Sequence, residues 1–444
     1  MKLAWILVAG AVCWAADDGA QRGPLELSLR RAVEIAISPE GNMNVVLAGE
    51  ALKQARGRSL ESRASLLPDL ESSVTYENRT TNLAALGFRV QIPAFLGISI
   101  PTFAGPFNTF DARVSGTQSV FDYSAIKRWQ ASKTGVSAAK QDVETTQERV
   151  AAQVARAYLA AVKADTDVET AQANVELALA LWKQAENEKA AGTGTGIEIT
   201  RAKVQLANDR QRLLEAQNAR HAADLRLLKA MSMRLDTGLK LTDRMAYVPV
   251  EPETLEQARK AALDGRPDWK AQQEREANAR ISASAVKMER VPSVAAFADY
   301  GSLGTGLDNA LPTRTYGVSV RVPVFDGGKR DARRAESASA YRAEKARTND
   351  LKEQIELDVR LALDDLQAAD DEVKVAQEGL GLAENELAHA RRRYDAGVAT
   401  GVEVTDAQTR LERAKENSTS AVYNFNVARI DLAQAMGRVR TEIR

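Results

Sequence analysis

The amino-acid sequence predicts a mostly α-helical protein built from two tandem copies of one unit, with a pair of β-strands in each copy. Three observations support this fold class. The segment AGTGTGIEITRA at residues 191–202 is echoed without a gap by AGVATGVEVTDA at residues 396–407. Only 5% of the residues are aromatic and 27% are charged, a composition typical of long helices and coiled coils. In each copy the hydrophobic periodicity changes from 3.6 to 2 in two short segments, which indicates β-strands.

The duplication extends beyond this segment. The repeats of a solenoid have about 20 to 50 residues, so the much longer period seen here indicates duplication of a whole subdomain. We expect the first copy at residues 17–236 and the second at residues 237–444. Further matching pairs, at the same or nearly the same offset, are FD at 121–122 and 325–326, and AM at 230–231 and 435–436.

Residues 1–16 have the pattern of a secretory signal peptide. A basic start is followed by an apolar stretch at residues 3–12 and by the small residues that precede a cleavage site. The stretch is too short for a spanning helix. The chain's single cysteine, Cys13, lies inside it, so the mature chain is expected to fold independently of redox state. Lipidation of Cys13 is not expected, because Val12 stands where a lipoprotein signal needs a small residue.

The strands are expected at about residues 70–78 and 110–121 in the first copy, and at about 294–302 and 313–325 in the second. In the last of these, Val318, Val320 and Val322 alternate with polar residues, which places them on one face of a strand. Two explanations of this face remain open. The strands could form a small sandwich packed on the helices, or they could face lipid in an outer-membrane barrel. Six of the nine phenylalanines lie between residues 88 and 121, and such aromatic enrichment at strand ends favours the barrel.

Two long helical hairpins follow the strands, at about residues 123–232 and 328–437. No proline interrupts residues 123–190 or 328–395, and a helix of about 65 residues is about 100 Å long. We expect Asp122 and Asp326 to cap the first helix of each hairpin. The glycine-rich segments at residues 192–198 and 397–403 are expected to form the turns at the tips.

Several classes of function are not supported by the sequence. Lysine and arginine together number 60, as do aspartate and glutamate, so no basic excess points to a nucleic-acid partner. His221 and His389 are the only histidines, and no cluster of ligands has metal-binding spacing. The glycines at 192–196 lack the Lys-Ser/Thr of a phosphate loop and join two helices. We therefore expect no metal, no cofactor and no enzymatic activity.

A set of short motifs, each weak alone, occurs in one order along nearly the whole chain. These are LLPDL at 66–70, QSVFD at 118–122, RPD at 266–268, VPVFDGG at 322–328, YDAG at 394–397, VEV at 402–404 and AMG at 435–437. In order and spacing they resemble the TolC-type outer membrane factors, the outer membrane efflux proteins of Gram-negative efflux pumps and type I secretion systems.

The resemblance implies a passive export duct for small molecules or proteins in the outer membrane, extending into the periplasm. It implies a homotrimer in which four strands per protomer complete one twelve-stranded barrel in outer membrane lipid, with the helices continuing as a periplasmic tunnel. It also implies two partners, a periplasmic adaptor (membrane fusion) protein and an inner-membrane pump or ABC transporter. The alternative is a structural periplasmic coiled-coil or adaptor protein without a channel.

The resemblance also points to a channel gate at the tips. Glu403 and Asp406 match an acidic ring that constricts the entrance, and their spacing places them on one helix face. Their first-copy counterparts, Glu198 and Arg201, are expected to form an ion pair. A hydrogen bond that ties the two hairpins together maps onto Tyr394 and Glu198. The alternative is that Tyr394 only packs in the coiled coil.

The same tips are the expected docking site for the adaptor, because small side chains let a partner helix approach closely. These residues are Gly192, Gly194 and Gly196 on one hairpin, and Gly397, Ala399 and Gly401 on the other. The alternative is that these glycines serve only to form the turns.

Overall fold

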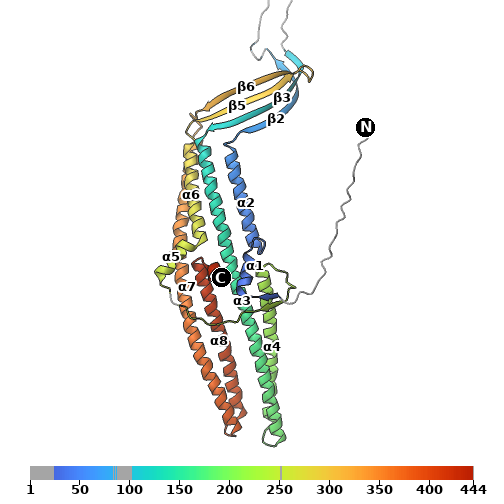
Figure 1. The fold of residues 1–444 in the computed structure, drawn as a ribbon, viewed down its shortest axis with the longest axis vertical. Helices are drawn as coiled ribbons and strands as arrows, with labels where there is room; N and C mark the ends of the chain where they lie inside the picture. The colour runs from blue at the N-terminus through green and yellow to red at the C-terminus, as the bar shows by residue number, and fades with distance from the viewer. Residues whose placement is uncertain (1–24, 84, 86, 88–102, 251–252, 444) are drawn as a thin grey trace, which may run out of the picture.

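The computed structural model describes residues 25–83, 85, 87, 103–250 and 253–443 (Figure 1). The predicted signal peptide lies outside these residues, as does most of the predicted loop between the first two strands. The molecule is elongated, with a β-sheet at one end and two helical hairpins at the other (Figure 1). Among the described residues, no helix is both long enough and apolar enough to cross a membrane.

Two continuous helices run most of the length of the molecule. They are α3 (Tyr123–Ala190), of 68 residues, and α7 (Lys329–Asp395), of 67 residues. In the half near the sheet, neighbouring helices pack in the order α2 (Met43–Ala64), α3, α6 (Pro267–Met288), α7. In the other half, α4 (Gly196–Ala230) packs on α3, and α8 (Gly401–Ala435) packs between α3 and α7. The hairpins α3–α4 and α7–α8 thus occupy the ranges predicted from the sequence.

The two long helices begin differently. Asp122 caps α3 as expected, because its Oδ1 accepts a hydrogen bond from the backbone nitrogen of Ala125 at 2.9 Å. The same expectation was wrong for Asp326. Gly327 and Gly328 have positive φ angles of 66° and 85°, which delays the start of α7, so Gly328 is its N-cap. Asp326 instead accepts hydrogen bonds from the backbone and side chain of Arg330.

The four strands form one antiparallel sheet in the order β2-β3-β5-β6. They are β2 (Asp69–Asn82), β3 (Phe103–Phe121), β5 (Ser293–Gly304) and β6 (Leu311–Arg321). The first two are longer than expected, because their pairing continues up to Asn82 and Phe103. The last is shorter than the predicted 313–325. Pro323 has no N–H to donate and restricts Val322 before it, so β6 ends at Arg321.

The cross-strand register sorts the side chains of the sheet onto two faces. The polar face carries residues such as Ser73, Arg113, Thr315 and Ser319. The other face is apolar and exposed, so within the described part of the chain no helix covers it, and the small-sandwich explanation was wrong. Its most exposed large side chains are Leu70, Val74, Tyr76, Val114, Tyr300, Tyr316, Val318 and Val320.

The largest core cluster surrounds the middle of α3. Here β1 (Leu25–Leu27) pairs in parallel with β4 (Leu239–Leu241), next to α1 (Leu29–Ile37). Tyr158 on α3 is buried in this cluster, and its hydroxyl donates a hydrogen bond to the carbonyl of Leu27 at 2.9 Å. The helices α5 (Leu255–Gly265) and α9 (Val439–Glu442) pack at the same level.

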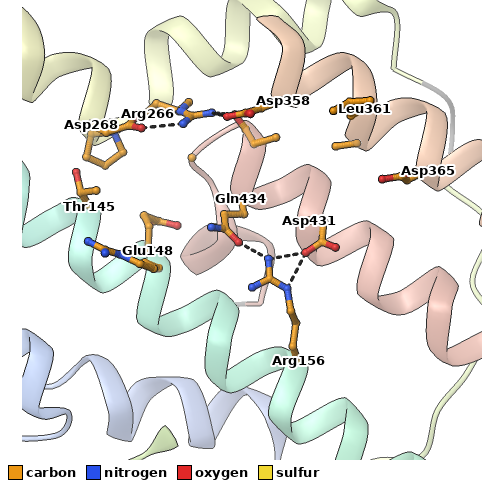
Figure 2. Close-up of a pocket in the computed structure, with 15 residues that line it drawn as sticks. Thr145, Glu148, Arg156, Arg266, Asp268, Asp358, Leu361, Asp365, Asp431 and Gln434 are labelled. Atoms are coloured by element: carbon orange, nitrogen blue, oxygen red, sulfur yellow. Dashed lines mark hydrogen bonds and ion pairs between the residues drawn. The ribbon is translucent and has the colours of Figure 1, made fainter. Parts of the chain in front are cut away.

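Polar side chains gather where the start of α6 and the end of α8 meet between α3 and α7. Arg266 donates to Asp358 at 2.9 Å and to Asp268 at 2.7 Å, while Arg156 on α3 donates to Asp431 on α8 at 2.7 Å (Figure 2). These side chains line an open cavity of about 670 Å³. The RPD motif at residues 266–268 is therefore part of this structural junction, where Arg156 and Asp431 link the two halves of the chain.

Candidate functional site

The tips of the two helical hairpins have the same turn. Gly192 and Gly397 adopt left-handed φ angles of 77° and 71°. In each turn, the glycine N–H and the next N–H bond back to carbonyls of the last helical turn, at distances of 2.8 to 3.0 Å. This is the arrangement that ends many helices, and it favours glycine at that position. The repeated glycine in the sequence therefore has a structural reason at these two positions.

Glu198 does not make either of its predicted contacts. Its carboxylate accepts hydrogen bonds from Thr195, at 2.8 Å from the backbone nitrogen and 3.2 Å from the hydroxyl. Together with the Thr195 side chain, these contacts form a capping box at the start of α4. The expected ion pair with Arg201 and hydrogen bond with Tyr394 are both replaced, because a local cap is within reach three residues away.

Tyr394 does join the two hairpins, but through another carboxylate. Its hydroxyl donates a 2.5 Å hydrogen bond to Glu188 in the last turns of α3. Its ring also packs against the cluster that contains Leu387 and Val404. Tyr394 and Glu198 line one small cavity between the hairpins without bonding to each other. Sequence reasoning missed Glu188 because it sought the partner after the turn. A carboxylate one turn before Gly192 was the signal that could have revealed it.

Glu403 and Asp406 lie three residues apart on one face of α8, where Asp406 is exposed and Glu403 is half-buried. They differ in their surroundings. Glu403 forms an ion pair with Arg393 near the end of α7, at 3.1 Å from the arginine Nε. Asp406 is exposed, and its carboxylate has no ion pair or hydrogen bond within the described residues. The free negative charge of this face therefore belongs mainly to Asp406.

A buried group of charges lies farther from the tips, between α4 and α8. The carboxylate of Asp209 is fully buried, and Glu412 is nearly so. Arg212 lies between them, at 2.6 Å from Glu412 and 3.6 Å from Asp209. Burial, and then the negative charge of Glu412, raise the pKa of Asp209 to about 6.

We expect this group to make the packing of α4 against α8 depend on pH. Because the folded-state pKa of Asp209 exceeds its unfolded value, the folded state binds the proton more tightly. The contribution of Asp209 to the stability of the folded state is complete below about pH 4. This contribution, on the order of 1–3 kcal/mol, is lost as the pH rises through about 6. Asp209→Asn should remove this dependence, measured as hydrogen exchange in α4 at pH 5 and pH 8.

The matched control for this prediction is Glu416→Gln, an exposed carboxylate that lines one groove together with Asp209, Arg212 and Glu412. This variant should keep the pH dependence of the wild type. If exchange in Asp209→Asn, corrected for intrinsic rates, changes with pH as it does in the wild type, then Asp209 does not titrate in this range.

Comparison with known proteins identifies the family. The chain belongs to the outer membrane efflux protein family, whose sequence model matches residues 42–232 and 258–438. The alkaline protease secretion protein AprF of Pseudomonas aeruginosa is 22% identical over 333 residues, covering 72% of this chain and 68% of that protein. The pyoverdine export outer membrane protein OpmQ of Pseudomonas putida is 23% identical over 413 residues, covering 91% of this chain and 84% of that protein.

Solved structures share the fold. The CmeC outer membrane channel of Campylobacter jejuni superposes with a TM-score of 0.78 at 17% identity, covering 92% of this chain and 85% of that one. VceC of Vibrio cholerae superposes with a TM-score of 0.77 at 18% identity, covering 92% of this chain and 96% of that one.

Family membership confirms the prediction of an outer membrane export duct that extends into the periplasm. The family consists of channel proteins rather than enzymes. The alternative of a structural coiled-coil protein without a channel is not supported. The relatives matched here are named for the secretion of a protein and for the export of a small molecule.

Proposed function

We propose that three copies of this chain form a closed export channel, with the sheets as a membrane barrel and the helical hairpins as its gated periplasmic end. The observation that carries this proposal is the uncovered apolar face of the sheet. The sheet also has two open edges, β2 and β6, each paired on one side only. Pairing β6 of one protomer with β2 of the next would close three four-stranded sheets into a twelve-stranded barrel, which has no unpaired edge in the bilayer.

We place the gate at the tips of the hairpins. The Tyr394–Glu188 hydrogen bond holds α7 to α3, and the Arg393–Glu403 ion pair holds the end of α7 to the start of α8. In a trimer, Asp406 and Glu403 would face a common axis. Asp406 would supply the uncompensated charge of this ring, whereas Glu403 would be partly neutralised by Arg393. Opening would then require the hairpins to separate at Tyr394.

Single-channel recordings test this gate. The double variant Glu403→Ala/Asp406→Ala should lose cation selectivity and block by multivalent cations added from the periplasmic side, because a ring of one charge concentrates counter-ions. Asp406→Asn alone should produce most of the loss. Arg393→Gln should strengthen the block, since it frees the charge of Glu403.

Glu198→Gln serves as the control, because this tip carboxylate is held in the cap of α4 and should contribute little to the ring. If the double variant keeps both the selectivity and the block of the wild type, these residues do not form the constriction. Absence of any conductance from the assembled wild type would instead contradict the channel.

We further propose that the adaptor docks on the small residues of the tips, and that it couples the duct to an inner-membrane pump or ABC transporter. The positions are Gly192, Gly194 and Gly196 on α3–α4, and Gly397, Ala399 and Gly401 on α7–α8. Support comes from two glycines that the turn does not need. Gly196 and Gly401 begin helices, and a Cβ there would meet only a lysine ammonium at 3.6 Å and the Tyr394 ring at 3.7 Å.

A further inference from the structure

The helices α2, α3, α6 and α7 form a wall next to the sheet, and one side of this wall has a groove. Residues from α2, α3, α6 and α7 together line one groove of about 700 Å³. On α3 these include Gly135, Ala139 and Asp142. Lys133 lies roughly a third to a half of a turn away from these residues and from Ala138, which also lines the groove. Lys133 therefore belongs to the opposite, outward side of the wall.

The same reasoning applies to the neighbouring helices. On α2 the groove is lined by Gln54 and Arg58, and on α6 by Asn278 and Ser282. The last turns of these helices carry Arg63 and Lys287, which helical periodicity places on the outward side. Three adjacent helices thus present basic side chains on one side, just below the sheet.

Aromatic rings accompany the lysines of α3. The Lys127 ammonium lies 5.5 Å from the centre of the Tyr123 ring, and the Lys133 ammonium lies 3.7 Å from the centre of the Trp129 ring. Such cation–π contacts hold the ammonium groups against apolar surface while leaving their N–H groups free to donate. We call the six residues the basic belt: Arg63, Tyr123, Lys127, Trp129, Lys133 and Lys287.

The cations of the basic belt lack acidic partners, although carboxylates are present at the same level. In the described part of the chain, none of the four forms an ion pair, and Lys127 donates its one hydrogen bond to the neutral Gln130 at 3.0 Å. The nearby carboxylates are already paired with other arginines. Glu289 pairs with Arg128 and Arg333, and Asp331 with Arg290. The belt therefore carries uncompensated positive charge.

The depth of the belt matches a membrane surface, if the sheet spans the bilayer as proposed above. At about 1.5 Å per residue, Lys127 lies about 9 Å and Lys133 about 18 Å beyond Phe121, the end of β3. Headgroup layers are about 5–8 Å thick, and charges act over a further 8 Å or so at physiological salt, so Lys127 lies well within this range and Lys133 at its outer edge. Lys140, on the same side of α3, lies about 28 Å beyond Phe121 and is out of range.

We propose that the basic belt binds the phosphate groups of anionic phospholipids in the periplasmic leaflet of the outer membrane. Tyrosine and tryptophan at this level suit the boundary between acyl chains and headgroups. Each lysine or arginine near an anionic surface favours such lipids by about fivefold. The belt would thereby fix the depth of the channel and orient the helical wall beneath the barrel.

Trp129 provides a reporter inside the belt. A chain of residues 17–444 with Trp182→Phe and Trp269→Phe has Trp129 as its single tryptophan. It is reconstituted in phosphatidylcholine bilayers containing one-fifth phosphatidylglycerol, with bromine atoms on either the phosphatidylglycerol or an equal amount of phosphatidylcholine. Stronger quenching by the brominated phosphatidylglycerol, corresponding to local enrichment of about fivefold or more, is the expected result. Salt at 1 M should reduce it.

Charge removal completes the test. Lys127→Gln/Lys133→Gln should abolish the preference for phosphatidylglycerol, whereas Lys140→Gln should keep it. Equal preference in the wild type and the double variant would overturn the proposal. Quenching by both lipids without preference would also overturn it, while leaving the sheet in the membrane. If the inserted protein is quenched by neither lipid, the boundary between the sheet and the helices lies away from the bilayer, which contradicts the proposed placement.

Discussion

Replacing Ala399 with tryptophan should abolish export without preventing trimer assembly or insertion into the outer membrane. Ala399 lies in the turn between α7 and α8, and its φ is not in the left-handed region, so the backbone can accept a larger side chain. The indole would occupy the space that an adaptor helix needs to approach the tip. The measurement combines substrate export by cells with the heat-modifiable migration of the trimer from outer membranes.

The control for this substitution is Ala399→Ser, which keeps the side chain small and should export normally. The glycines of the tips sharpen the interpretation. Gly192 and Gly397 are needed for the left-handed turns, and a Cβ on Gly194 would lie 3.0 Å from the backbone of Lys189. Loss of the trimer in Ala399→Trp would therefore mean that the tip residues serve the turn rather than a partner.

Features with a local physical cause could be predicted from the sequence. The two long helices follow from the absence of proline, and the tips follow from glycine at a left-handed turn. The cap at Asp122 follows from a carboxylate just before a helix. The strands follow from the alternation of apolar and polar residues, although Pro323 should have been taken to end β6 earlier. Gly327 and Gly328 similarly delayed α7, which displaced Asp326 from the expected cap.

Features that depend on how two distant helices are aligned could not be predicted. The partner of Tyr394 is Glu188 rather than Glu198, because the relative height of α7 and α3 decides which carboxylate is in reach. The same holds for Arg393 and Glu403, which meet across a turn. The pairing of β1 with β4 was missed because three-residue strands are too short to show a periodicity.

Replacing Val318 with arginine should destabilise the assembled channel by about 2–4 kcal/mol for each protomer, because the side chain would face the hydrocarbon core. Val318 is on the apolar face of β6, opposite Ala296 on β5, and is 67% exposed in the single chain. Val320 shares this face but is next to the end of the strand, so arginine there should cost less. Val322 lies beyond β6 and is no longer expected to face lipid as a strand residue.

Ser319→Arg is the matched control, since this neighbour projects from the polar face of the same strand. In a barrel its arginine would lie in a water-filled lumen, and the variant should assemble as the wild type does. Folding into lipid vesicles, followed by urea titration of the heat-modifiable form, gives the stability of each variant. Equal stability of the Val318 and Ser319 variants would contradict the barrel register. Greater loss at Ser319 would mean that the polar face, rather than the apolar one, is turned toward lipid or protein.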